Sequence, residues 1–247
     1  MTDFVIPPPA QAVVPVAGSA RVFPVRRIYC VGRNYAAHAR EMGADPTREA
    51  PFFFCKPADA VVPALPDASL ALPDASLALP DASLALPYPT QTRDFHYEAE
   101  LVVAIGQGGA DIPVDAALAH IWGYTVGLDM TRRDLQAALK SKGHPWEAAK
   151  AFDRSAPIAP LVPVVDCGHP QAGAIWLTVN GQPRQRGDLA DMIWSVAEIV
   201  ARLSTLFRLE PGDLIFTGTP EGVGPVVSGD AIEAGVEGVG RLALKVA

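Results

Sequence analysis

Two acidic residues lie on an otherwise apolar predicted strand, and they constrain the fold more than any other feature of the sequence. The segment HYEAELVVAIG spans residues 96–106, and we expect a strand over 97–105. Because side chains alternate along a strand, Glu98 and Glu100 share one face, and the opposite face is wholly apolar. Two carboxylates on one half-buried face repel each other. Exposure to water, basic neighbours or a bound cation would each relieve that repulsion.

Short strands separated irregularly by short helices surround this segment. We expect a short helix near 114–121, a strand at 122–128, a helix at 131–141, a hairpin over 174–187 that turns at Asn180-Gly181, and a helix over 190–206 with Ile193, Val196, Ile199, Val200 and Leu203 on one face. The segment GDLIFTGTP (212–220) reads as a strand that runs into a tight turn. This order favours an α+β fold, β-rich and mixed, over regular βαβ winding.

The chain divides into an arm and one catalytic domain. Residues 1–20 are rich in Pro, Ala and Val, which predicts an extended N-terminal arm, and residues 21–247 contain no linker that would divide them. Within the domain, ALPDASL occurs three times in tandem over 64–84. The proline in every unit excludes a coiled coil, so we predict a surface loop without chemistry.

Composition excludes several classes of partner. The net charge of −7 argues against nucleic acid and anionic membrane, because both require a basic face. The three cysteines form no C-x-x-C pair, and the N-terminus lacks the pattern of a secretory signal. No stretch approaches the length of a membrane span. We therefore expect a cytoplasmic protein with reduced thiols that acts on a small molecule.

A third acid extends the acidic cluster. Asp129 ends the apolar strand of GYTVGLDMTRRDLQ (123–136). Three carboxylates at strand ends offer only hard oxygen ligands, which select Mg²⁺, or otherwise Mn²⁺ or Ca²⁺. Six-coordinate Mg²⁺ would keep open positions for water and substrate. We therefore predict a divalent-metal site at Glu98, Glu100 and Asp129.

Two polar residues follow Asp129 at helical spacing. Arg133 can fork to a substrate carboxylate, and Gln136 can donate to an oxygen. An ordinary solvated helix face explains the same spacing. Thr131 and Asp134 resemble a helix capping box in which Asp replaces the usual Glu.

Three further segments offer groups for catalysis or anion binding. In CVGRNYAAHAREMG (30–43), His38 and Glu41 would meet on one helical face, where a carboxylate orients an imidazole as a water-activating base. Lys150 can stabilise an oxyanion, and Thr219 in TGTPEGVG can hold a carboxylate together with backbone N–H groups. A surface ion pair, a lysine that reaches solvent and a bare glycine turn are the corresponding structural readings.

These segments together resemble the fumarylacetoacetate hydrolase family. The ordered motifs are GRNYAAHAREMG, PFFFCKPADAVV, HYEAELVVAIG, GYTVGLDMTRRDLQ, PWEAAKAFD and DLIFTGTPEGVG. The resemblance implies metal binding by Glu98, Glu100 and Asp129, water activation by His38 and Glu41, an active-site lysine at Lys150, and substrate contacts from Arg133, Gln136 and Thr219. It also implies a β-rich mixed fold and a homodimer.

Within the family, FPVRRIYCVGRNYAAHAREMG and RQRGDLADMIWSV look most like bacterial fumarylpyruvate hydrolases of gentisate breakdown. The implied reaction is hydrolysis of the C–C bond of an acylpyruvate, a 2,4-dioxo acid, such as fumarylpyruvate. A distal cation should hold the fumaryl carboxylate, and Arg33 and Lys56 are the candidates. The alternatives are oxaloacetate decarboxylation or 2-hydroxydienoate isomerisation at the same site, or a non-catalytic protein that keeps the metal for stability.

Overall fold

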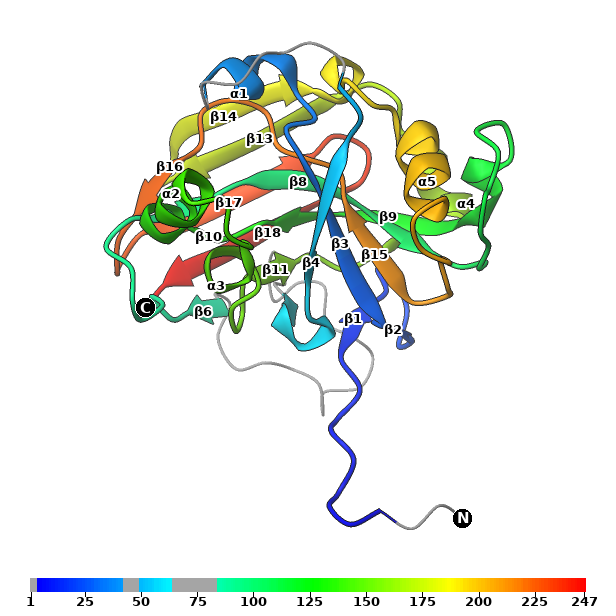
Figure 1. Cartoon of the computed structure of the whole chain (residues 1–247), viewed down its shortest axis with the longest axis horizontal. Coiled ribbons are helices and arrows are strands. Elements are labelled where there is room, and N and C mark those ends of the chain that lie inside the picture. The colour runs from blue at the N-terminus through cyan, green and yellow to red at the C-terminus, as the bar shows by residue number, and fades with distance from the viewer. Residues whose placement is uncertain (1–3, 42–48, 64–83) are drawn as a thin grey trace.

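The computed structural model describes residues 4–41, 49–63 and 84–247, and strands dominate this part of the chain (Figure 1). The largest sheet has eight strands: β4 (Phe52–Lys56), β3 (Arg27–Gly32), β15 (Asp213–Phe216), β8 (Ala99–Ile105), β9 (Ile121–Leu128), β11 (Ala156–Ile158) and β5 (Val61–Pro63) in that order, with β12 (Val162–Pro163) paired to β9. The five-stranded sheet contains β14 (Gln182–Asp188), β13 (Ala174–Val179), β17 (Ala231–Val236), β18 (Gly240–Val246) and β6 (Leu84–Leu86).

Two smaller sheets complete the strands of the described residues. One pairs β1 (Val13–Pro15) with β2 (Val22–Pro24), and the other contains β10 (Thr131–Arg132), β7 (Phe95–Tyr97) and β16 (Gly224–Val226). The helices are short: α1 (Ala36–Glu41), α2 (Arg133–Ser141), α3 (Glu147–Lys150), α4 (Val164–Cys167) and α5 (Val196–Ser204), with 3-10 turns η1 (Ala58–Ala60), η3 (Ala117–His120) and η4 (Leu189–Asp191). Of the described helices, none combines the length and apolar character that crossing a bilayer requires.

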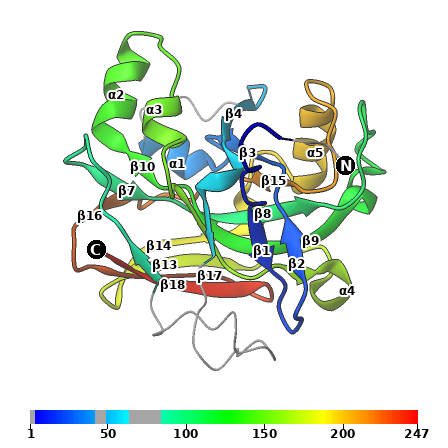
Figure 2. The ribbon, with the colours of Figure 1, turned by 90° about the horizontal axis from the view of Figure 1, so that it is seen from below.

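The core explains why β8 is apolar on both faces. Ala99, Leu101, Val103 and Ile105 belong to an apolar cluster that the five-stranded sheet shares, and Figure 2 shows that sheet as a layer against β8 and β9. Val102 and Ala104 point the other way, into a second cluster with β3 and β15. Every residue of β8 is buried, as the apolar run predicted.

The predicted elements are present, and three of them differ in detail. The hairpin over 174–187 is confirmed as β13 and β14, but the helix expected over 190–206 begins at Val196. There Ser195 and Glu198 form a capping box that fixes the first turn, so Ile193 lies before the helix. The helix near 114–121 is the 3-10 turn η3, and the strand expected over 97–105 is interrupted at Glu98, between β7 and β8.

The predicted capping box at Thr131 and Asp134 is wrong. Thr131 lies in β10, and its hydroxyl donates to the backbone oxygen of Asp129. The Asp134 carboxylate accepts hydrogen bonds from Thr92 Oγ1 and from the Arg93 N–H instead. Asp134 therefore ties α2 to the loop before β7, and α2 begins at Arg133 without a side-chain cap.

The two segments predicted to lie outside the core have different outcomes. In the arm, residues 4–11 are exposed, but Val13–Pro15 forms β1 and both Val14 and Val16 are buried. Their burial in the second apolar cluster makes this half of the arm part of the fold. The tandem repeat over 64–84 lies outside the described residues, except for Leu84 at the start of β6.

The pairing of β8 with β9 brings the acidic residues together. These strands run antiparallel, with Ala99 opposite Leu128 and Glu100 opposite Gly127. The start of β8 therefore lies next to the end of β9, at one end of these two central strands, and α2 and α3 lie on that side of the molecule (Figure 2). Asp129 follows β9 directly, and its N–H donates to the Glu98 backbone oxygen at 2.9 Å.

Candidate active site

The three predicted metal ligands converge on one point. One carboxylate oxygen from each of Glu98, Glu100 and Asp129 lies within 4.8 Å of the others. All three residues are buried, with 5%, 1% and 1% of their surface exposed. Burial excludes bulk water as the source of relief for their mutual repulsion.

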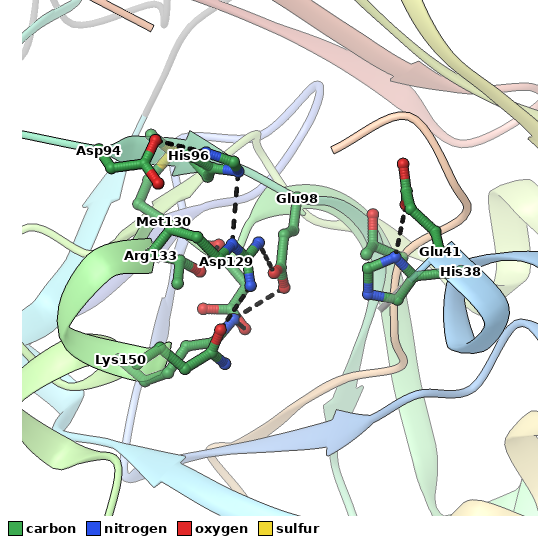
Figure 3. A network of polar contacts seen from close by, with 12 residues as sticks. His38, Glu41, Asp94, His96, Glu98, Asp129, Met130, Arg133 and Lys150 are labelled. Atoms are coloured by element: carbon green, nitrogen blue, oxygen red, sulfur yellow. Dashed lines mark hydrogen bonds and ion pairs between the residues drawn. The ribbon is translucent and has the colours of Figure 1, made fainter. Parts of the chain in front are cut away.

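Three cations lie among these acids, and Figure 3 shows two of them, Lys150 and Arg133. Lys150 Nζ donates to Glu98 Oε2 at 2.8 Å and to Asp129 Oδ2 at 2.7 Å. Arg133 Nη2 donates to Glu98 Oε1 at 2.5 Å, and Lys56 Nζ lies 2.8 Å from Asp129 Oδ1. Burial works against the charge of Glu98, but Lys150 and Arg133 outweigh it and lower the pKa of that carboxyl below its ordinary value.

Glu100 is the acid without a basic partner among the described residues. Its Oε2 accepts one hydrogen bond, from the Gly218 N–H at 2.7 Å. Burial, followed by the charges of Asp129 and Glu98, raises the pKa of Glu100 well above its ordinary value. A positive charge placed between the three carboxylates would lower the pKa of Glu100 again, against both its burial and the charges of Asp129 and Glu98.

The donor set fits a divalent cation. All three ligands are carboxylate oxygens, which suit Mg²⁺, Mn²⁺ and Ca²⁺. Asp129 Oδ1 is buried and close to Lys56 Nζ but makes no well-aligned hydrogen bond, so it keeps a lone pair for a metal. Glu98, Glu100 and Asp129 also line one pocket, which leaves room for further ligands beside them.

The predicted base lies across the same pocket. Glu41 Oε2 is 3.1 Å from His38 Nδ1, and His38 is buried on the short helix α1. The Glu41 carboxylate also accepts from the Gly222 N–H, at 3.1 Å and 3.3 Å to its two oxygens. The glycine turn therefore fixes Glu41, which fixes the His38 ring and turns its Nε2 away from Glu41.

The predicted substrate contacts line the pocket as well. Arg133 and Gln136 project from one face of α2, and Arg133 Nη1 donates to Gln136 Oε1 at 2.5 Å. Thr219 Oγ1 accepts from Gln185 Nε2 at 2.8 Å, while Gln185 Oε1 accepts from the Ala99 N–H. Because Gln185 uses an acceptor site of Thr219, the hydroxyl proton of Thr219 remains available to a bound anion.

Aromatic rings and two cations form the rest of the wall. Phe52 and Phe54 both pack against Trp146, and all three rings line the pocket. Arg33, one of the two predicted distal cations, lines the pocket with its guanidinium 5.5 Å from the centre of the Phe52 ring. Lys140 on α2 also lines it.

Lys56 is placed differently from the prediction that it holds a distal carboxylate. Its ammonium is buried and contacts Asp129 Oδ1 and the backbone oxygens of Met130 and Lys150. The two backbone oxygens accept hydrogen bonds from the ammonium, Asp129 Oδ1 lies at ion-pair distance, and Lys56 does not line the pocket. Lys56 therefore holds the Asp129 carboxylate from behind the pocket.

Several residues of this site were missed in the sequence, among them Lys140, His96, Gln185 and Trp146. Lys140 lies four residues after Gln136, so the helical spacing that indicated Arg133 and Gln136 also indicates Lys140. His96 precedes Glu98 by two residues and shares its strand face. Gln185 and Trp146 have no such local signal, because their partners are distant in sequence.

The chain matches the family described as Fumarylacetoacetate (FAA) hydrolase C-terminal over residues 27–247. It therefore belongs to the fumarylacetoacetate hydrolase family, as the ordered motifs predicted. It is an enzyme, a hydrolase that acts on carbon–carbon bonds.

Particular relatives are similar over most of the chain. The crystal structure of fumarylpyruvate hydrolase from Pseudomonas aeruginosa in complex with Mn²⁺ and pyruvate has a TM-score of 0.91 and 55% identity, and 99% of each chain is covered. A fumarylpyruvate hydrolase from Ralstonia sp is 49% identical over 159 residues, which are 64% of this chain and 82% of the relative. The mitochondrial oxaloacetate tautomerase FAHD1 of Mus musculus is 42% identical over 221 residues, 90% and 91% of the two chains. The structural likeness confirms the predicted α+β, β-rich fold class.

Proposed function

We propose that this enzyme hydrolyses the C3–C4 bond of an acylpyruvate, and that fumarylpyruvate, which gives fumarate and pyruvate, is its substrate. One observation carries the proposal: His38, held by Glu41, lines the same pocket as three convergent carboxylates. The pair supplies a base for water, and the carboxylates supply a divalent-metal site. The similarity to two fumarylpyruvate hydrolases supports the choice of acyl group.

Each residue of the site has a separate role in the proposed reaction. A divalent cation held by Glu98, Glu100 and Asp129 would supply Lewis-acid polarisation of the 2-oxo acid. His38, oriented by Glu41, takes a proton from water, and the resulting hydroxide adds to the C4 carbonyl carbon. The C3–C4 bond breaks, its electron pair remains on the pyruvate fragment, and protonation of C3 completes pyruvate. The other product is the carboxylic acid of the acyl group.

Five cationic or polar groups of the wall suit the carboxylates of the substrate. Arg133, Gln136 and Thr219 lie where they can donate to the 2-oxo acid end. Lys150 is the donor for the oxyanion that develops at C4. Its ammonium uses two of its three N–H groups on Glu98 and Asp129, so one N–H remains for the oxyanion. Arg33 and Lys140 line the aromatic part of the pocket and provide positive charge for a second carboxylate, such as that of a fumaryl group.

The metal, assembly and setting follow as further parts of the proposal. Mg²⁺ is the metal that we propose for the cell, and Mn²⁺ is supported by the complex of the similar enzyme. A cytoplasmic location remains a prediction from composition, and a homodimer and a place in gentisate breakdown remain predictions from the resemblance.

Turnover of defined substrates tests the function. The purified enzyme is incubated with Mn²⁺ and fumarylpyruvate, and the decay of the enol absorbance is followed together with the release of pyruvate. His38→Ala should lower kcat by about 10²–10⁴, the typical contribution of a general base. The variant should still bind Mn²⁺ and oxalate, whereas unchanged turnover would exclude His38 as the base. A wild-type enzyme that leaves every acylpyruvate intact refutes the proposed function.

A second candidate is the enolisation or decarboxylation of oxaloacetate. The similarity to oxaloacetate tautomerase FAHD1 over 90% of the chain favours it. Neither reaction requires a water nucleophile, so the His38–Glu41 pair favours hydrolysis. Parallel assays with oxaloacetate and fumarylpyruvate distinguish the two, because decarboxylation releases CO₂ and tautomerisation leaves the carbon skeleton intact.

A further inference from the structure

One polar pair beside the active site has no part in the chemistry above. His96 Nε2 lies 2.8 Å from Asp94 Oδ1, and His96 Nδ1 lies 3.3 Å from Arg133 Nε (Figure 3). The chain of contacts thus runs from Asp94 through the His96 ring to the guanidinium of Arg133. From there it continues to Glu98.

These contacts determine where the proton of the His96 ring lies. Arg133 Nε carries a hydrogen and has no lone pair, so it can only donate, and Nδ1 of His96 must be the acceptor. The ring proton is therefore on Nε2, which faces the Asp94 carboxylate and donates to it. Asp94 and Arg133 select the same tautomer from opposite sides of the ring.

The same segment also anchors the backbone of Arg133. The Arg133 N–H donates to the Asp94 backbone oxygen at 2.8 Å, and His96 is the strand partner of Thr131 between β7 and β10. Both ends of the arginine are thus held by residues 94–96. Its Nη1 and Nη2 then point at Gln136 and Glu98, within the pocket.

We propose that His96, with Asp94, positions Arg133 so that its guanidinium can receive the carboxylate of the 2-oxo acid while it steadies the ligand Glu98. The substrate half of this proposal rests on the proposed function. A free arginine side chain loses conformational entropy when a ligand orders it. Hydrogen bonds from Nε and the backbone N–H order Arg133 beforehand, so substrate binding does not pay that cost.

A set of four variants tests the proposal. His96→Leu removes the acceptor and leaves a buried Arg133 N–H unpaired, while His96→Asn places an amide oxygen near the position of Nδ1. Asp94→Ala removes the group that selects the tautomer. His144→Leu is the matched control, because His144 is exposed and lies outside the pocket.

The first measurement separates binding from chemistry. Because Arg133 would hold the substrate carboxylate equally in the ground and transition states, His96→Leu should raise KM and the Kd of oxalate about tenfold and leave kcat within about threefold. His96→Asn should recover most of that loss, and Asp94→Ala should lie between wild type and His96→Leu. An effect on folding alone would lower the melting temperature without this split or this rescue. An unchanged oxalate Kd in His96→Leu overturns the proposal.

The second measurement needs no turnover. The chain has five histidines, so nitrogen NMR of histidine-labelled protein resolves each ring, and His96→Leu identifies the signals of His96. We expect a protonated Nε2 and a bare Nδ1 in the wild-type protein, and a protonated Nδ1 overturns the assignment. If His96→Leu fails to fold, the signals that are missing from His96→Asn identify the His96 ring. If the wild-type enzyme hydrolyses no acylpyruvate, the proposed function fails, whereas the NMR and oxalate results still decide the role of His96.

Discussion

Replacing Glu100 by Gln should stabilise the metal-free enzyme and abolish its tight metal binding. Glu100 is buried beside two other carboxylates, and its side chain accepts only the Gly218 N–H among the described contacts. A glutamine of the same shape can keep that hydrogen bond through its oxygen, and its NH₂ group can donate to Asp129 or Glu98. The substitution thus removes a repulsive charge and also removes a metal ligand.

The size of the effect follows from the separation of the charges. Two carboxylates no more than 4.8 Å apart repel by about 3.5 kcal/mol at an effective dielectric constant of about 20. The Gly218 N–H and the ammonium of Lys150 offset part of this in the wild-type protein. Replacing buried ion pairs by neutral side chains of similar volume stabilises some proteins by about 1–4 kcal/mol, and we take about 2 kcal/mol for removing this unpaired charge. For a chain of this length, that is a rise of about 4–8 °C in melting temperature.

Thermal denaturation in chelator and titration with Mn²⁺ measure the two effects. Because the folded-state pKa of Glu100 is raised, its contribution to the free energy of unfolding is fully present below the unfolded pKa. That contribution is lost as the pH rises through the folded pKa. The advantage of Glu100→Gln should therefore grow with pH and vanish in acid. Mn²⁺ should raise the melting temperature of the wild type and leave the variant unchanged. Glu233→Gln, on an exposed position of β17, is the control.

Two outcomes would refute this reasoning about Glu100. If the metal-free variant melts at or below the wild-type temperature at alkaline pH, the repulsion that we infer is absent. If Mn²⁺ affinity falls by less than about tenfold, the carboxylate is not a metal ligand, since even residues that only orient a ligand contribute about 10–100-fold.

Two further substitutions test the pocket wall and the glycine turn. Lys140→Met should raise KM for fumarylpyruvate about tenfold, the cost of losing one charged contact, and should leave KM for acetylpyruvate unchanged; equal effects on both substrates would show that Lys140 does not contact the second carboxylate. Gly222→Ala should lower kcat and spare Mn²⁺ affinity, because Gly222 has φ +90° and a Cβ there would lie 2.1 Å from the Arg184 backbone oxygen, which displaces the N–H that holds Glu41. Wild-type kcat in Gly222→Ala would show that the turn does not position the base.

The features that the sequence predicted best depend on local periodicity. The two faces of β8 and the convergence of Glu98 with Glu100 follow from the two-residue repeat of a strand. The pairing of His38 with Glu41, and of Arg133 with Gln136, follows from helical spacing of three residues. Such patterns are set by backbone geometry, so a single sequence displays them.

The features that were missed depend on contacts between distant segments. Lys56 was predicted to hold a substrate carboxylate, but β4 carries it behind Asp129, and nothing in the motif PFFFCKPADAVV specifies that neighbour. Gln185 comes from the five-stranded sheet, and it reaches both Thr219 and the backbone of β8. The boundary of α5 was misplaced for a local reason, because the apolar spacing continued past the capping box at Ser195.

The cations resolve the question that the acidic strand first posed. Three explanations were open for buried carboxylates: water, basic neighbours or a bound cation. Burial excludes water, and the ammonium and guanidinium groups of Lys56, Lys150 and Arg133 satisfy Asp129 and Glu98. Basic neighbours therefore explain two of the three acids without any metal. Glu100 is the exception, because its only described hydrogen bond is from a backbone N–H. A divalent cation at this site is therefore required mainly to balance the charge of Glu100.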